Sequence, residues 1–273
     1  MKHPIHTAII LSFIILTFQG CYDRSASNFY VAREYQKLIA LGKMDRSPEN
    51  YQKIDKYYRK SLEFNPDNPV VNMNYGEFLF YRNRVIQAVN HLKRAIKHKP
   101  DYYTCHVLLS YIYLIKENNP LYNRDAAKRH LVQAEAFVDK TNPRHLEALA
   151  NVYIVDERSA KALKAYNLAL DLAPNDFLMI NNFAMFLVTV KDKKYRDPKR
   201  ALKLAKRAEA LSGGRKAFII DTLAEAHHAS GNYKEAVLEA RRAIFLSGSS
   251  TETLIYKKNL KRFEKALREK SSP

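Results

Sequence analysis

A regular pattern of apolar, small and proline residues constrains this chain more than any other feature of its sequence. The period is about 34 residues, which is typical of repeat proteins in which each unit buries its apolar stripe against its neighbours. Gly42 and Gly76 lie one period apart, Pro66 and Pro100 have the same separation, and a large apolar residue precedes each glycine. The 273 residues include only 7 Gly and 10 Pro, which favours helices joined by short loops over many strands.

Six copies of the pattern can be aligned. The clearest are the fourth, with Leu146, Leu149, Ala150, Tyr153, Ala162, Tyr166, Ala169 and Pro174, and the sixth, with Leu223, Ala224, Gly231, Tyr233, Ala236, Ala240 and Ala243. Over roughly residues 30–250 the spacing resembles the tetratricopeptide repeat (TPR). The resemblance implies an all-α fold, a right-handed α-solenoid of about six helix hairpins. The copies lie near 35–68, 69–102, 103–142, 143–176, 177–216 and 217–250, so the repeat domain covers 35–250.

The residue types of the pattern have a physical reason. Two helices cross closely only where a small residue on one faces a large residue on the other, and Ala150 and Ala224 are expected to fill this role. The proline that follows a copy ends its second helix, because it lacks an N–H donor and clashes with the preceding turn. Copies three and five are longer, with extra residues in 117–123 and 191–196, and Asp197-Pro198 predicts the start of a helix.

Residues 1–20 are interpreted as a signal peptide. They contain one basic residue, Lys2, and an apolar run over 8–18 that is too short for a stable membrane-spanning helix. The following Gly20-Cys21 resembles the end of a bacterial lipoprotein signal, although Phe18 and Gln19 depart from its usual residues. The resemblance implies acylation of Cys21 with palmitate-type chains and a membrane-anchored protein in the cell envelope. It would face the periplasm, with the outer membrane favoured over the inner one.

One alternative to acylation remains open at this end of the chain. Ordinary signal-peptide cleavage after residues 25–27 would discard Cys21. Residues 21–34 are interpreted as a tether that leads into the first helix. The other cysteine, Cys105, lies among large apolar residues and is expected to be buried and inert.

The formal net charge of +18 is compatible with several partners. Nucleic acid, an anionic membrane and an acidic protein would each be attracted, and a merely solvated basic exterior is the remaining interpretation. Runs of Lys and Arg fall on the second helices, at 53–60, 93–99 and 199–207. In TPR proteins those helices form the outer face, where anionic lipid headgroups could be met. The signal peptide argues against nucleic acid.

No set of residues indicates catalysis, and no metal or cofactor is expected. The chain lacks a CxxC pair and a phosphate-binding loop, and His227 and His228 would point about 100° apart on a helix. The prediction is therefore a non-enzymatic protein.

The resemblance also implies where a partner binds. In TPR proteins the first helices line a groove, and positions 2, 5, 9 and 12 of each repeat face the ligand. In copies five and six these positions include Val188 and His228. The residues selected as a peptide-binding groove are Met73, Glu77, Tyr111, Asn151, Asn181, Asn182, Met185, Asp221 and Glu225. Asn181 and Asn182 could form hydrogen bonds with a peptide, beside Tyr111 and Met185 as apolar anchors. The alternative is that much of the uncharged helix over 177–190 is buried between its neighbours.

These features predict a non-catalytic scaffold or adaptor. Its groove would bind a protein or peptide segment during envelope assembly, secretion or pilus-type biogenesis, while a lipid on Cys21 holds it on a membrane. The alternative is a cytoplasmic or soluble basic repeat protein that binds nucleic acid or another polyanion.

The last segment, 251–273, is expected to contain a capping helix and a short tail. Leu254, Tyr256, Leu260, Phe263 and Leu267 have helical spacing, and a solenoid needs a helix to cover its last apolar face. A helix that binds a membrane or a partner is the alternative, because the segment is basic.

Overall fold

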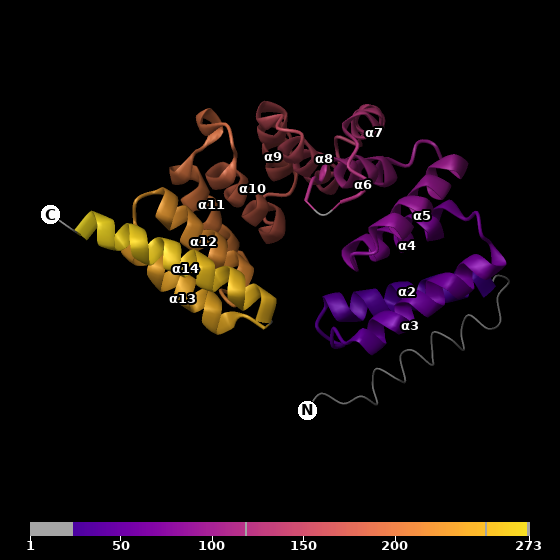
Figure 1. Ribbon diagram of the computed structural model, residues 1–273, viewed down its shortest axis with the longest axis horizontal. Coiled ribbons are helices and arrows are strands. Elements are labelled where there is room, and N and C mark those ends of the chain that lie inside the picture. Colours follow the sequence, from indigo (N-terminus) through magenta and orange to yellow (C-terminus); the bar gives the residue numbers. More distant parts are fainter. Residues whose placement is uncertain (1–23, 118, 249, 272–273) are drawn as a thin grey trace. The chain divides into compact units, whose positions relative to one another are not determined.

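The computed structural model describes residues 24–117, 119–248 and 250–271, which form helices and loops without a strand. The predicted signal peptide and Cys21 lie outside these ranges. The chain divides into two compact units, residues 1–137 and 138–273. Each unit is a stack of helix pairs (Figure 1). The predicted all-α helical-repeat fold is therefore confirmed.

The described part of the first unit contains three helix pairs. α2 (Arg24–Ala40) packs on α3 (Pro48–Phe64), α4 (Pro69–Tyr81) on α5 (Val85–His98), and α6 (Tyr103–Leu114) on α7 (Arg124–Phe137). A core cluster joins the first two pairs and includes Ile54, Tyr58, Tyr75 and Phe78. This core is rich in aromatic side chains.

The second unit contains three further pairs and a final single helix. α8 (Pro143–Val155) packs on α9 (Ser159–Leu172), α10 (Phe177–Thr189) on α11 (Pro198–Leu211), and α12 (Ala217–Ala229) on α13 (Tyr233–Leu246). A short 3-10 helix, η1 (Lys193–Tyr195), lies in the loop before α11, and α14 (Ser250–Ser271) closes the stack.

Local signals place the helix starts. From the second pair to the sixth, the first helix of each pair begins where a copy of the sequence pattern begins. These starts are Pro69 for α4, Tyr103 for α6, Pro143 for α8, Phe177 for α10 and Ala217 for α12. Asn68 and Asp176 accept bonds from backbone N–H groups of the first turns of α4 and α10. Asp197 caps α11 and Pro198 is its first residue, as Asp197-Pro198 predicts. Capping oxygens satisfy donors that have no partner inside the helix.

The tether predicted over residues 21–34 is wrong for its described part, because α2 begins at Arg24. In the structure Ser25 is buried, and its hydroxyl donates to the carbonyl oxygen of Ser61 on α3 at 2.9 Å. Val31 and Ala32 add apolar contacts further along the helix. The long first helix thus owes its start to contacts with α3.

Helix α14 covers the end of the second unit. Tyr256 and Phe263 are buried against α12 and α13, whereas Leu254 is 68% exposed although it belongs to the predicted apolar stripe. Leu254 lies two residues before Tyr256, about 200° around the helix, so the face that buries Tyr256 leaves Leu254 exposed. Cys105 is fully buried on α6, as expected, and burial raises its thiol pKa to about 12. None of the helices in the described ranges is both long and apolar enough to cross a bilayer.

Candidate functional site

In the first unit, the predicted ligand-facing residues form a partly exposed apolar strip with one acid. Tyr111 on α6 meets Phe80 on α4 edge to face, with ring centroids 6.0 Å apart. Met73 lies half-buried on α4. Burial raises the pKa of Glu77, and the positive charge of Arg33 on α2 opposes this rise. Met73, Glu77 and Phe80 are spaced four and three residues apart, so they lie on one face of α4.

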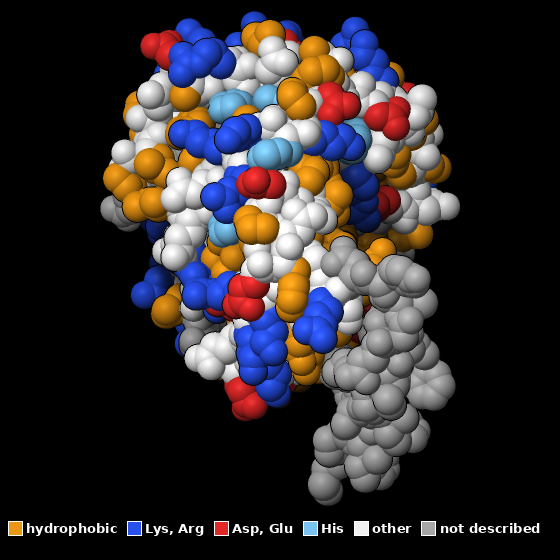
Figure 2. All heavy atoms as spheres, turned by 90° about the vertical axis from the view of Figure 1, so that its right-hand side faces the viewer, with side chains coloured by type: hydrophobic (Ala, Val, Ile, Leu, Met, Phe, Trp, Pro, Cys, Tyr) orange, Lys and Arg blue, Asp and Glu red, His pale blue; other side chains and the backbone are white. Residues whose placement is uncertain are grey.

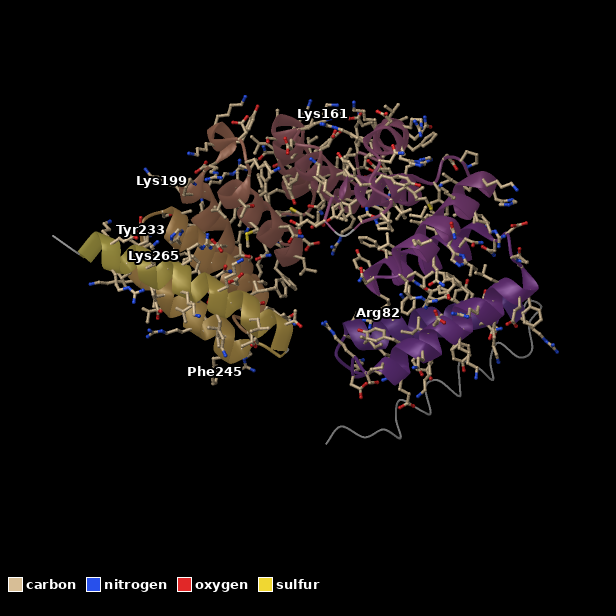
Figure 3. The ribbon with its side chains drawn as sticks, in the orientation of Figure 1. Arg82, Lys161, Lys199, Tyr233, Phe245 and Lys265 are labelled. Carbon is tan, nitrogen blue, oxygen red and sulfur yellow. The ribbon has the colours of Figure 1, made fainter. Side chains whose placement is uncertain are left out.

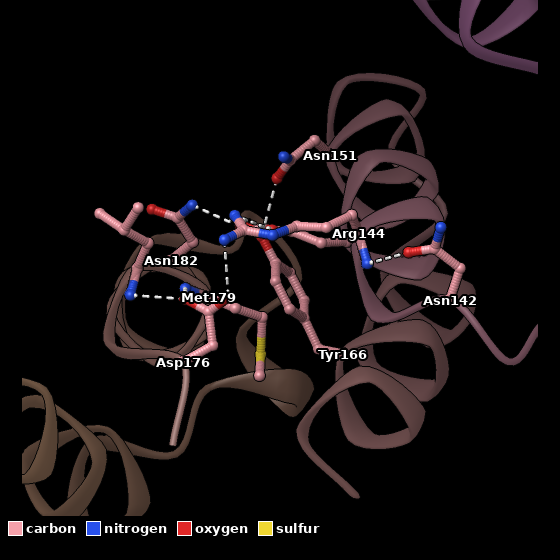
Figure 4. A network of polar contacts seen from close by, with 9 residues as sticks. Asn142, Arg144, Asn151, Tyr166, Asp176, Met179 and Asn182 are labelled. Carbon is pink, nitrogen blue, oxygen red and sulfur yellow. Dashed lines mark hydrogen bonds and ion pairs between the residues drawn. The ribbon is translucent and has the colours of Figure 1, made fainter. Parts of the chain in front are cut away.

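In the second unit, a polar network that includes Arg144, Asp176 and Asn182 joins α8 to the start of α10 (Figure 4). Asn182 on α10 donates from Nδ2 to Glu147 Oε1 at 2.8 Å. Arg144 Nη2 lies 2.9 Å from Asp176 Oδ2, and its Nη1 lies 3.7 Å from Glu147 Oε2. Burial raises the pKa of Glu147, while Asn182 and Arg144 act in the opposite direction. The network ties α8 to α10.

Asn151 also has an internal partner. The hydroxyl of Tyr166 on α9 donates to Asn151 Oδ1 at 2.7 Å (Figure 4). Tyr166 is almost fully buried and stacks on the ring of Phe183 at a centroid distance of 5.0 Å. The bond fixes the orientation of the Asn151 amide, which is only partly exposed.

Two of the predicted groove residues are too buried to meet a ligand in this conformation. Asn181 is 5% exposed and Asp221 is 7% exposed. Helix α10 packs against α9, α11 and α12, which encloses Asn181, and its Oδ1 has no hydrogen-bond partner. Asn259 on α14 donates to Asp221 Oδ1 at 3.0 Å, and burial raises the pKa of that carboxyl group. Asn182 and the half-buried Met185 are the accessible members of the group on α10.

The pairing of an acid with an asparagine occurs twice in this unit. Glu147 is the fifth residue of α8 and accepts from Asn182 on the next first helix. Asp221 is the fifth residue of α12 and accepts from Asn259 on α14. Helix α14 therefore contacts α12 as the first helix of a further repeat would. This relation was missed in the sequence, where its signal is an acid at the fifth position of a first helix followed by an Asn about one period later.

A pocket of about 530 Å³ lies at the ends of α10 and α12. Three of its residues, Val188, Glu225 and His228, occupy positions that the TPR resemblance predicts to face a ligand. The complete lining is Val188, Thr189, Arg196, Pro198, Glu225, His228, Ala229 and Arg262. Glu225 forms an ion pair with Arg262 of α14, and burial raises the Glu225 pKa.

The other polar side chains of this pocket are also held in place. Arg196 is exposed, and its Nε donates to the carbonyl oxygen of Val190 at 2.8 Å. The His228 ring lies 4.8 Å from the ring of Phe263, and burial lowers its pKa. The pocket thus combines an apolar surface with two cations: Arg262, which is paired with Glu225, and Arg196, which bonds to a backbone carbonyl. Such a site suits a side chain that is apolar along its length and carries an acceptor at its end.

Charge is divided between the two kinds of helix. The first helices α4, α6, α8, α10 and α12 carry four carboxylates and one cation, Arg144. The second helices α3, α5, α7, α9, α11 and α13 carry twenty Lys or Arg against nine Asp or Glu. Lys161 and Lys199 extend away from α9 and α11 (Figure 3). Within the described residues, no group of three or more His, Cys, Asp or Glu is placed to hold a metal ion.

Comparison with known proteins supports the fold. No family model and no curated relative matches the sequence. Among solved structures, Cut9 in the APC/C Cut9–Hcn1 heterotetramer has a TM-score of 0.69 at 14% identity, over 93% of this chain and 45% of that one. PilW, a type IV pilus biogenesis factor, has a TM-score of 0.63 at 14% identity, over 86% of this chain and 99% of that one.

Yeast Tom70 is also similar, with a TM-score of 0.57 at 19% identity over 91% of this chain. The chain spans about half the length of the Tom70 and Cut9 chains, of which 48% and 45% are covered. These structures are TPR proteins, so the chain has a TPR-type fold. At these identities the similarity establishes the fold alone.

Proposed function

We propose that this protein is a non-catalytic scaffold that binds a segment of another protein on its first-helix faces. The observation that carries the proposal is the pocket at α10 and α12. It contains residues from predicted ligand-facing positions of two successive repeats, with an apolar surface and fixed charges. A peptide in helical or extended form could place one anchoring side chain there and continue along Asn182 and Met185.

The pocket is tested by putting a charge on its apolar surface. Val188→Glu is expected to reduce recovery of cross-linked partners from envelope extracts by about tenfold, because the added carboxylate would occupy the pocket and compete with the partner's anchoring side chain. The matched control is Leu238→Glu on α13, where the side chain is 63% exposed. Both variants should keep the wild-type helical circular dichroism. Equal partner recovery from Val188→Glu and wild type would exclude this pocket as the binding site.

We also propose that the protein is exported and anchored by a lipid on Cys21. The support is the apolar run over residues 8–18 and the Gly20-Cys21 pair. Helix α2 begins at Arg24, three positions after Cys21 in the sequence. A lipid there would hold the first helix pair close to the membrane, and each buried CH₂ would contribute about 0.8 kcal/mol.

Metabolic labelling with a palmitate analogue tests the anchor. The wild-type protein should be labelled and fractionate with membranes, and Cys21→Ala should abolish the label. A role in envelope assembly, secretion or pilus-type biogenesis would follow from the partners recovered by cross-linking. A wild-type protein that is unlabelled and soluble in the cytoplasm, and that binds DNA or RNA in a salt-sensitive manner, would contradict the proposal and favour the polyanion-binding alternative.

A further inference from the structure

A basic cleft lies on the second-helix side of the first unit. It has a volume of about 690 Å³ and is formed by α3, the end of α4 and the start of α5. Five cationic side chains line it, against two carboxylates, Asp55 and Glu63; the cations are Lys56, Arg59, Lys60, Arg82 and Arg84. A second cleft of about 380 Å³ shares Arg59 and Arg84 and adds Arg94. Figure 2, viewed from the right-hand side of Figure 1, shows more Lys and Arg than Asp and Glu on the visible face.

Three guanidinium groups in the cleft are already held in place. Asp55 accepts from Arg59 Nε at 2.7 Å and from Arg84 Nη1 at 2.5 Å, and the Tyr75 hydroxyl donates to it at 2.8 Å. The Arg82 guanidinium lies 3.9 Å from the centre of the Tyr51 ring. Fixed side chains lose less entropy when a ligand binds. Arginine presents paired N–H donors that match the oxygens of a phosphate group.

Lys56 and Lys60 complete the cationic side of the cleft. They lie one turn apart on α3, and both are exposed. Because the five cations outnumber the two carboxylates, the cleft keeps a positive charge after Asp55 is paired. A phosphate group would therefore meet both fixed donors and uncompensated charge.

The cleft is also close, along the chain, to the proposed lipid anchor. Ser25 on α2 and Ser61 on α3 bond to each other, with Ser61 Oγ donating to the Ser25 carbonyl oxygen at 2.6 Å. Lys60 precedes Ser61 directly. Cys21 lies four residues before Ser25, a distance of about 14 Å at most in an extended chain. An acyl chain on Cys21 would hold this end of α3 near the headgroup layer, where surface charge acts over a Debye length of about 8 Å.

We infer that the cleft of α3, α4 and α5 binds the phosphate group of an anionic phospholipid headgroup. The inference rests on the proposed anchoring of Cys21, which brings the cleft to the membrane. It assigns a membrane-facing role to the second-helix side of the first unit. The first-helix faces stay available for a protein partner.

Vesicle flotation tests the inference with the full chain carrying Cys21→Ser, so that no acyl chain contributes. Vesicles of phosphatidylcholine alone are compared with vesicles of phosphatidylcholine and phosphatidylglycerol in equal parts. The cleft variant combines Lys56→Gln, Lys60→Gln and Arg82→Gln, and leaves the Asp55 ion pairs intact. The control removes the same charge from α11 through Lys199→Gln, Lys203→Gln and Lys206→Gln.

The cleft variant should lose about tenfold or more of the phosphatidylglycerol-dependent binding, and the control no more than about threefold. Inorganic phosphate should displace wild-type chain more strongly than chloride at equal ionic strength. Equal losses in both variants would overturn the inference, since they would indicate non-specific attraction. Displacement by a polyglutamate peptide but not by phosphate would also overturn it, in favour of an acidic protein partner.

A further comparison separates lipid from free phosphate. Calorimetry measures the binding of inorganic phosphate to the cleft variant. The lipid assignment is overturned if this variant no longer binds phosphate but still floats with phosphatidylglycerol vesicles as wild type does. Failure of the anchor is detected separately, because the palmitate labelling of Cys21 in cells does not depend on the cleft. Unchanged circular dichroism of both triple variants shows that they fold.

Discussion

The α4/α5 hairpin of the first unit and the α12/α13 hairpin of the second match in helix length. They differ in the residues that pack where the two helices cross. Each pair has 13 residues in its first helix and 14 in its second. The eighth residues of the two helices are Gly76 and Leu92 in one hairpin, and Ala224 and Ala240 in the other. A Cβ atom on Gly76 would lie 2.9 Å from Leu92 Cγ, which is closer than real side chains approach.

The α12/α13 crossing is filled in another way. Ala224 and Ala240 belong to a buried cluster that also contains Phe263 of α14. Two alanines therefore leave space that the next helix fills, whereas glycine and leucine fill the crossing within one hairpin. The comparison shows that the repeat pattern specifies a total volume at the crossing rather than one residue at each position.

The largest expected effect is at the filled crossing of the second unit. Phe263→Ala should lower the free energy of unfolding by about 3–5 kcal/mol, because it leaves a cavity between α14 and the α12/α13 pair. Urea denaturation measures the loss, and hydrogen exchange should locate it in α12 to α14. Phe245→Ala is the control, because Phe245 is 87% exposed and its loss should change stability by less than about 0.5 kcal/mol. Similar losses in the two variants would contradict the packing role of Phe263.

The α4/α5 crossing should respond to added volume. Gly76→Ala is expected to cost about 1–2 kcal/mol, because a clash with Leu92 outweighs the better helix propensity of alanine. In a Leu92→Ala background the same substitution should cost less, since the two Leu92 atoms at 2.9 and 3.0 Å are absent and only the Ala88 carbonyl oxygen at 3.1 Å remains close. The denaturation midpoints of the four proteins in this cycle provide the measurement. Additive effects would show that the close approach is unimportant.

The α4/α5 hairpin also contains a partly buried histidine that makes it sensitive to acid. Burial lowers the pKa of His91 to about 4 from an ordinary value of 6.5, and its Nδ1 lies 2.8 Å from Asn72 Oδ1. Between these two pKa values the unfolded chain binds more protons than the folded one, so stability is present above pH 6.5 and is lost as pH falls toward 4. The free energy of unfolding should fall by only about 1 kcal/mol, because the ring is partly exposed and solvent screens the effect.

Hydrogen exchange of α4 and α5 at several pH values measures this loss, and His91→Gln should flatten the profile in that hairpin. The same measurement on α12 and α13 should not change with this variant. An unchanged pH profile in α4 and α5 would show that His91 is not the group responsible.

The smallest expected effect concerns a single hydrogen bond at a third crossing. Tyr166 and Ala150 are the eighth residues of α9 and α8, so a large side chain again faces a small one. Tyr166→Phe keeps the ring and removes the bond to Asn151, which should cost about 1 kcal/mol in denaturation. Tyr122→Phe is a control at an exposed ring in the loop before α7. Equal stability of Tyr166→Phe and wild type would exclude an energetic role for the bond.

Most of the fold could be predicted from the sequence because its signals are local or periodic. Proline, capping residues and small residues at fixed spacing indicated where the helices of five repeats begin. The first helix was placed too late, because contacts such as Ser25 with Ser61 join residues 36 positions apart and leave no local pattern. Cys105 was correctly expected to be buried, since its neighbours on the helix are apolar.

The candidate site was less predictable than the fold. The positions selected from the repeat do lie on the first helices, but their exposure depends on the helix that follows each pair. Asn181 and Asp221 are enclosed by such helices, and Asn182 bonds to Glu147 across the stack. The pocket at Val188, Glu225 and His228 also includes Arg262 from α14. Its lining therefore comes from several helices, and no single repeat contains all of it.

The sequence alone therefore determined the helix pairs, their register and the division of charge between first and second helices. These follow from steric and hydrogen-bonding preferences that act within a few turns or recur at one period. Only the tertiary structure decided which polar groups are buried, which carboxylates are paired and where the clefts lie. Burial and pairing arise between helices that are distant along the chain, where stacking sets the separation of their side chains.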